Sequence, residues 1–86
     1  MKIKYTMHAE KQLKERNIFK EAVYETVLSP GQVILQEEGI LLFQSVYYDG
    51  NKEYLLRVAV KLIADTWVIL TAYRTSKVKK YWGDDL

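Results

Sequence analysis

The chain has no cysteine, one histidine, one proline and four glycines among its 86 residues. The absence of cysteine excludes a disulfide framework, a thiolate metal site and a cysteine nucleophile. The single histidine and the scattered carboxylates lack metal-ligand spacing, so we expect no metal site and no cofactor. All four glycines lie at expected turns, which argues against a glycine-rich phosphate loop.

Long hydrophobic runs are also missing. The N-terminal segment MKIKYTMHAEK lacks the apolar core of a signal peptide, and the longest apolar stretch is interrupted by Arg57, Lys61 and Asp65. These features predict a cytoplasmic protein without a membrane partner. Residues 1–86 are too few for two independent cores, so a single domain is expected.

The small net charge of +2 conceals an uneven distribution. Residues 1–20 carry six Lys or Arg against two Glu, residues 21–56 one Lys against six acids, and residues 57–82 six Lys or Arg against one Asp. If the first helix and the last strand meet in space, the basic segments form one positive surface, as in proteins that bind a polyanion. Lysines that only keep a small protein soluble would give the same pattern, so both interpretations stay open.

Strand-like alternation is strongest in residues 54–74, which read YLLRVAVKLIADTWVILTAYR. Before the hinge at Ala64-Asp65-Thr66, one face carries Leu56, Val58, Val60 and Leu62. After it, Val68, Leu70 and Ala72 alternate with Trp67, Ile69, Thr71 and Tyr73. Period-two alternation of β-branched and aromatic residues indicates strands with one buried face. We therefore predict a long β-hairpin at the centre of an antiparallel sheet.

The rest of the chain predicts helices followed by strands. Helices are expected at about residues 7–16, with Thr6 as N-cap, and 20–28, with a poor cap at Phe19. Strands are expected at 32–37 and 40–48, a basic lead-in at 2–5 is compatible with an edge strand, and Ser76 is a candidate cap for a short basic C-terminal helix. The predicted fold is α+β: two N-terminal helices packed on one face of a four-stranded antiparallel sheet.

Several polar side chains lie where they could serve chemistry. Arg57 lies in a run that is apolar on both faces, a costly position for a guanidinium unless it has a partner; a structural salt bridge and a binding site both fit. His8 lies in the first turn of a helix, where the helix dipole opposes imidazolium formation, so a neutral general base and a merely solvated residue are both possible. Lys61 fits a solvated strand charge as well as a site, and Tyr73 fits a core ring as well as a site.

A family resemblance rests on motifs spread over residues 5 to 75. They are His8-Ala9, a helix ending Glu15-Arg16-Asn17-Ile18, a second helix closing near Pro30, and a last strand with Val68, Thr71 and Tyr73. Together they resemble the bacterial family called domain of unknown function 4258, which is similar to the RelE/ParE and BrnT toxins. Asn17 stands where that family usually has glycine, and Phe19 where Ser or Thr is common; both departures affect helix ends.

The resemblance implies a RelE-like fold and a toxin of a bacterial toxin–antitoxin pair, a candidate metal-independent endoribonuclease. In that chemistry a ribose 2′-OH attacks the adjacent phosphate. On this reading His8 is the base, Arg57 and Arg74 hold the phosphate, and Tyr73 positions it or donates a proton. The nucleic-acid-binding candidates are Arg16, Lys61, Lys77, Lys79 and Lys80.

The expected partners are RNA or the ribosome, and an antitoxin-like protein. A binding module of the same fold without catalysis is the alternative, and so is an accessory domain that only pairs with such a partner. The sequence leaves the oligomeric state open.

Overall fold

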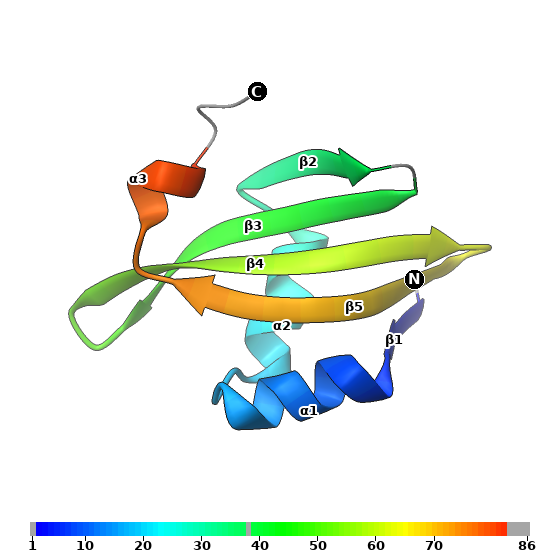
Figure 1. Ribbon diagram of the computed structural model, residues 1–86, viewed down its shortest axis with the longest axis horizontal. Helices are drawn as coiled ribbons and strands as arrows, with labels where there is room; N and C mark the ends of the chain where they lie inside the picture. The colour runs from blue at the N-terminus through cyan, green and yellow to red at the C-terminus, as the bar shows by residue number, and fades with distance from the viewer. Residues whose placement is uncertain (1, 38, 83–86) are drawn as a thin grey trace.

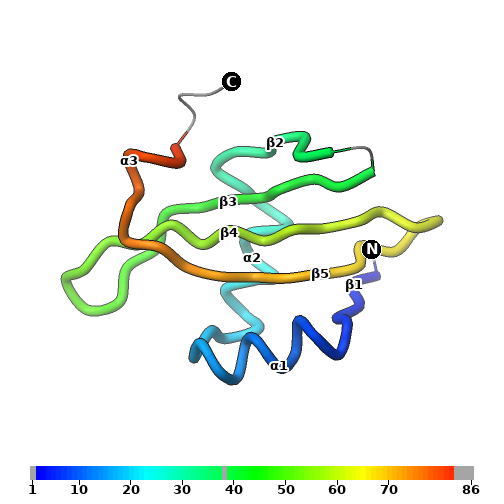
Figure 2. Tube along the Cα trace, in the orientation of Figure 1, coloured from blue at the N-terminus to red at the C-terminus, as the bar shows by residue number. Residues whose placement is uncertain are grey.

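The computed structural model describes residues 2–37 and 39–82, and a five-stranded sheet forms its centre (Figures 1 and 2). In chain order the elements are β1 (Lys2–Tyr5), α1 (Met7–Glu15), α2 (Lys20–Leu28), β2 (Gln32–Glu37), β3 (Ile40–Asp49), β4 (Lys52–Ile63), β5 (Thr66–Thr75) and α3 (Val78–Tyr81). The strand order across the sheet is β1-β5-β4-β3-β2.

The predicted α+β class is confirmed, but the prediction of four antiparallel strands is wrong. The basic lead-in forms a fifth strand, β1, which pairs with β5 in parallel, whereas the other neighbouring strands are antiparallel. β1 pairs only with Thr66–Ile69, because α1 begins directly after it and takes the chain along the rest of β5.

The predicted central hairpin is present as β4 and β5. Leu56, Val58 and Val60 are buried on one face of β4, as their alternation predicts. The turn after β4 contains Ala64 with φ of 56°, a left-handed conformation that favours glycine over a residue with a Cβ. The hairpin is the scaffold on which the candidate site residues lie.

A β-bulge in β5 overturns the expected alternation of residues 66–73. Ala59 pairs with Thr71 but Val60 pairs with Ile69, so Leu70 has no opposite residue. The extra residue reverses the faces of the strand beyond it. Ile69 and Ala72 are therefore both buried in one core, and Thr71 and Tyr73 project from the other face.

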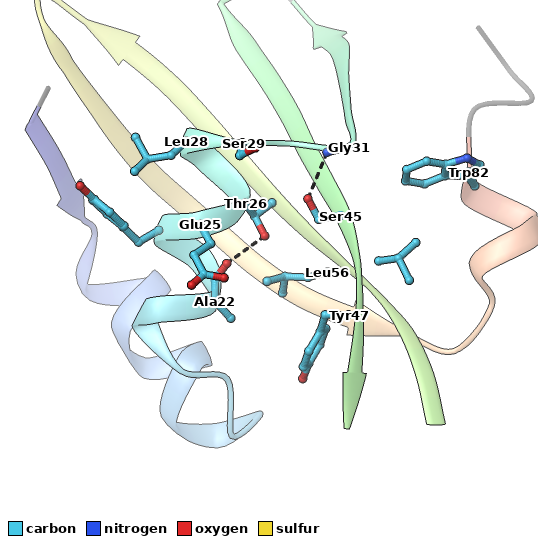
Figure 3. Close-up of a pocket in the computed structure, with 12 residues that line it drawn as sticks. Ala22, Glu25, Thr26, Leu28, Ser29, Gly31, Ser45, Tyr47, Leu56 and Trp82 are labelled. Atoms are coloured by element: carbon cyan, nitrogen blue, oxygen red, sulfur yellow. Dashed lines mark hydrogen bonds between the residues drawn. The ribbon is translucent and has the colours of Figure 1, made fainter. Parts of the chain in front are cut away.

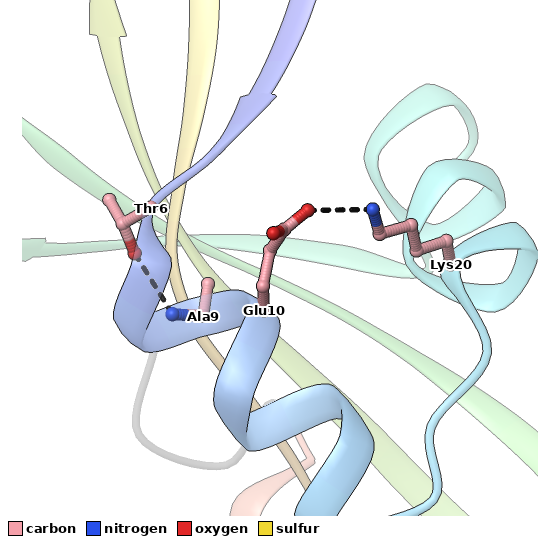
Figure 4. A network of polar contacts seen from close by, with 4 residues as sticks. All are labelled: Thr6, Ala9, Glu10 and Lys20. Atoms are coloured by element: carbon pink, nitrogen blue, oxygen red, sulfur yellow. Dashed lines mark hydrogen bonds and ion pairs between the residues drawn. The ribbon is translucent and has the colours of Figure 1, made fainter.

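Local signals explain where α1 begins and ends. Thr6 is the N-cap as predicted, and its hydroxyl accepts a hydrogen bond of 3.0 Å from the Ala9 N–H (Figure 4). Asn17 has φ of 55°, which suits asparagine just after a helix. Phe19, the N-cap of α2, makes no side-chain cap bond, in agreement with its poor capping chemistry.

The two helices do not simply lie side by side on one face. α2 crosses the sheet behind β3 and β4, whereas α1 runs along the outer edge of β5 (Figure 1). Both contribute to one core, in which Ala9 and Leu13 of α1 meet Val23 and Val27 of α2 and the α2-facing side of the sheet. Within residues 2–37 and 39–82, no long helix covers the opposite face of the sheet.

Polar groups of α1 and of its two caps occupy the edge of β5 that β1 leaves open. The Thr6 N–H donates to Ile69 O at 3.1 Å, and the Arg16 guanidinium donates to Ala72 O at 2.8 Å. The side-chain oxygen of Gln12 accepts from the Thr71 hydroxyl and from the Ala72 N–H. The first helix and the last strand thus meet, as the prediction of one positive surface requires.

Candidate functional site

Arg57 is the centre of a polar cluster on the sheet face opposite α2. Its Nε donates to Gln44 Oε1 at 3.0 Å, and one terminal nitrogen donates to the Tyr73 hydroxyl at 2.5 Å. The register places both partners directly opposite Arg57, Gln44 on β3 and Tyr73 on β5. Three adjacent strands therefore hold the half-buried guanidinium in one orientation.

Gln44 fixes Arg57 without neutralising it. The Gln44 side chain is fully buried, and its Nε2 donates to Gln32 Oε1 at 2.6 Å and to the Tyr81 carbonyl at 3.0 Å. Both polar atoms of the Gln44 side chain therefore have hydrogen-bond partners. A glutamate in its place would add a charge and lose the two donors, so the amide suits the neighbours and leaves the positive charge intact.

The C-terminal turn α3 lies over the same cluster. The Tyr81 ring stacks on Arg57, with 4.3 Å from the guanidinium carbon to the ring centroid, a distance typical of a cation–π contact. The predicted short basic helix is confirmed, although Lys77 rather than Ser76 is its N-cap. Around it, Lys77, Lys79 and Lys80 are exposed.

Arg57 takes part in neither of the two ion pairs found among residues 2–37 and 39–82, which are Lys20–Glu10 and Arg74–Asp49. The structural salt bridge considered for Arg57 is therefore absent from the described part of the chain. Its partners are an amide, a phenol and an aromatic ring, and none of them is a carboxylate. The cluster keeps a net positive charge in a fixed place.

Lys61 shares the face of β4 that carries Arg57. It lies four residues further along, which corresponds to about 13 Å in a strand, and it is exposed. Together with the lysines around α3, it gives this face cations on two sides of Arg57.

Arg74 is not part of this cluster. It pairs with Leu56 on the α2-facing side, where it donates to the Tyr47 hydroxyl at 2.7 Å and to Asp49 at 3.1 Å. The hydrogen bond to Tyr47, and then that to Asp49, raise the pKa of Arg74 above its ordinary value. Because the two arginines project from opposite faces, the structure does not bring Arg57 and Arg74 together on one phosphate.

His8 lies on α1 and Arg16 is the C-cap of that helix, both at the edge of the sheet. His8 is exposed in the first turn, and no hydrogen bond among the described residues joins it to Arg57 or Tyr73. It precedes Gln12 by one helical turn, and Gln12 contacts Thr71, which shares the face of Tyr73. Arg16 is exposed but has one nitrogen committed to Ala72 O.

A separate hollow lies between α2 and the sheet (Figure 3). It has a volume of about 870 Å³. Its lining residues include Tyr24, Glu25, Leu28, Tyr47, Leu56 and Trp82. None of the predicted site residues lines it, and its one charged side chain is acidic. A mostly apolar hollow with a carboxylate does not suit a polyanion, so we place the candidate site at Arg57.

Sequence reasoning missed Gln44 and Tyr81. A signal for Gln44 existed, because it is the one polar residue between Leu42 and Val46 on a face that is otherwise apolar. Counting back from the Gly50-Asn51 turn places residue 44 opposite residue 57. Within residues 2–37 and 39–82, no three His, Asp or Glu side chains could hold a metal ion, and no helix could span a membrane.

Comparison with known proteins identifies a family. The family model described as Domain of unknown function (DUF4258) matches residues 5–74. Searches of curated proteins and of solved structures found no match. The matched region contains α1, α2 and the four strands from β2 to Arg74 of β5, and with them His8, Gln44, Arg57 and Tyr73. The chain therefore belongs to the DUF4258 family.

Proposed function

We propose that this protein is a toxin-like RNA-binding protein and a candidate metal-independent endoribonuclease, whose substrate phosphate is held at Arg57. The observation that carries the proposal is the fixed, un-neutralised guanidinium on the sheet face opposite α2. A guanidinium that only stabilised the fold would be matched best by a carboxylate. An arginine held by uncharged groups keeps its charge for an anion from outside.

Phosphate is the anion that the surroundings favour. Lys61 lies along the strand on one side of Arg57, and Lys77, Lys79 and Lys80 lie around α3 on the other. An extended chain of phosphates can meet several such cations in turn, whereas a single small anion can meet one. Tyrosine rings beside the arginine add surfaces on which unpaired bases can stack, as is common in single-stranded RNA recognition.

Tyr73 is the candidate proton donor. Its hydroxyl is hydrogen-bonded to Arg57, so a phosphate at the guanidinium would lie close to the phenol. In cleavage by the 2′-OH, Arg57 would stabilise the charge of the pentacoordinate phosphorus and Tyr73 would protonate the leaving 5′-oxygen. His8 is the candidate base, and it would act from α1, across the edge formed by Gln12 and Thr71.

A binding module without catalysis is the second candidate. The observation in its favour is that His8 makes no hydrogen bond to the Arg57 cluster within the described residues. On this alternative the same cations bind RNA, but no base is in place, and an antitoxin-like protein would regulate binding instead of cleavage.

The experiment incubates the purified protein with total RNA and with translating ribosomes, beside four variants. Tyr73→Phe removes one hydroxyl from the cluster, and Tyr48→Phe is its control, since Tyr48 is exposed at the β3–β4 turn. Arg57→Gln removes the central charge, and Lys14→Gln removes an exposed charge on α1.

Loss of cleavage in Tyr73→Phe with binding retained, and loss of both in Arg57→Gln, would support the nuclease. Wild-type binding without cleavage would support the binding module. If RNA is neither cleaved nor bound in a salt-dependent way, both candidates are wrong.

A further inference from the structure

The two edges of the sheet are protected very differently. At one edge, β1 carries Lys2 and Lys4, and α1 occupies the part of β5 that β1 leaves free. Lysines on an edge strand and a helix laid along it are two known ways to prevent another chain from pairing there. At the other edge, β2 has β3 on one side and no strand on the other among residues 2–37 and 39–82.

β2 has no comparable protection along its regular part. Its sequence is QVILQE, without Lys, Arg or Pro, and its only charge is Glu37 at the end. Val33 is 46% exposed and Leu35 69%, on the side of the sheet that carries α2, and Leu28 nearby is 47% exposed. A bulge at Gln36 ends the regular pairing with β3, so Gln32–Leu35 form the open edge.

We propose that β2 pairs with β2 of a second copy of this chain, antiparallel and centred on Ile34. In a two-fold symmetric antiparallel pair, opposite residues lie on the same face of the joined sheet. Centring on Ile34 places Val33 opposite Leu35 twice on the α2 side, and Ile34 opposite Ile34 on the other side. The three central contacts of this strand pair are then apolar against apolar, and Gln32 lies opposite Gln36 at each end.

Charge favours the same partner and the same register. No charged residue lies between Gln32 and Gln36, so two copies can approach without repulsion at the centre. Each Glu37 would lie opposite Gly31 of the partner, at opposite ends of the pair. Moving the centre to Leu35 would place Val33 opposite Glu37, and moving it to Val33 would place Ile34 opposite Gln32. Both alternatives set an apolar side chain against a polar one.

The joined sheet would have ten strands, within the range of open sheets. The interface lies at the far edge from α1, and the Arg57 cluster is centred on β3, β4 and β5. A dimer joined through β2 would therefore carry two Arg57 clusters. The proposed pairing of the two β2 strands does not depend on what the Arg57 clusters bind.

Sedimentation equilibrium of the full chain over a wide range of concentrations tests the proposal. We expect the mass of two 10.1 kDa chains. Leu35→Lys should give the mass of one chain, because a charge at the centre of the pair opposes association. Leu62→Lys is the matched control: Leu62 is 50% exposed on the same side of the sheet but on β4, so this variant should stay dimeric. Circular dichroism verifies that both variants fold.

The lack of cysteine allows the register to be tested directly. Under mild oxidation, Ile34→Cys should form a disulfide-linked dimer across the two-fold axis, whereas Leu62→Cys should not. A wild-type chain that remains monomeric at high concentration refutes the proposal. So does a dimer that Leu35→Lys leaves intact, since its interface would lie elsewhere.

Discussion

Replacement of Gln44 by leucine tests whether this buried amide holds the Arg57 cluster. Leucine has a similar volume but no polar atoms. The change removes the bond from Arg57 Nε and both bonds from Gln44 Nε2, to Gln32 and to the Tyr81 carbonyl. The guanidinium then lies half-buried against an apolar side chain.

The size of the effect follows from these three bonds. Loss of a hydrogen bond to a charged group costs about 1.5–3 kcal/mol. The acceptors on Gln32 and Tyr81 are half-exposed and can turn to water, so each adds less than about 1 kcal/mol. Burial of leucine at a fully buried position recovers about 1 kcal/mol. We therefore expect the free energy of unfolding to fall by about 2–3 kcal/mol.

Urea unfolding monitored by tryptophan fluorescence measures this change, because Trp67 and Trp82 report on the core and on the end of α3. A double-mutant cycle with Arg57→Met isolates the coupling between the two side chains. If Gln44→Leu lowers stability by less than about 0.5 kcal/mol, or if the cycle shows no coupling, the amide does not hold the arginine and Arg57 is not a fixed site.

Gln44→Glu tests whether RNA binding needs an un-neutralised charge on Arg57, because glutamate can still hold the guanidinium in place. Glutamate keeps an acceptor for Arg57 but neutralises it, and it faces two carbonyl oxygens without a donor. We expect RNA binding to weaken about ten-fold although residue 44 is buried away from any ligand. Unchanged binding would show that the charge on Arg57 is not what RNA contacts.

Two further changes test the fold. Ala64→Gly should raise the free energy of unfolding by up to about 1 kcal/mol, because relief of the left-handed strain exceeds the entropy cost of glycine; a lower urea midpoint would contradict this. The hydrogen bond from Lys20 lowers the pKa of Glu10 below its ordinary value of 4.5 (Figure 4), so the pair stabilises the fold above pH 4.5. In urea unfolding, the difference between wild type and Glu10→Gln should shrink as the pH falls below that value, and a difference that grows would refute the assignment.

Local pattern was sufficient for most elements and for the β3–β4 and β4–β5 hairpins, but not for the pairing of β1. Thr6, Asn17 and the alternation of β4 are local signals, and the structure confirms each. The parallel pairing of β1 was not predicted, because KIKY alternates like a strand but four residues are too few to identify a partner. The position of β1 beside β5 depends on how α1, the helix that follows it, packs along β5.

The bulge at Leu70 shows a second limit. An unbroken period of two places Ile69 with Thr71 and Tyr73, yet the structure buries Ile69 in the core with Ala72. The choice between a regular strand and a bulged one depends on the partner strand, where Ala59 and Val60 continue without interruption. Placement of Tyr73 beside Arg57 therefore required the structure, although both residues were candidates from the sequence.

The contrast between the two arginines connects fold and proposed function. Arg74 faces a carboxylate and a phenol near the β3–β4 turn, so its charge is compensated and its contacts hold the strand ends together. Arg57, on the opposite face, has hydrogen-bond partners of equal number but no negative charge among them. Burial of a charge without compensation costs free energy, and a sequence can avoid that cost by using a carboxylate at residue 44. Because a neutral amide occupies that position, the charge of Arg57 stays available to an anion, and we therefore propose binding at the Arg57 face and structural support by Arg74.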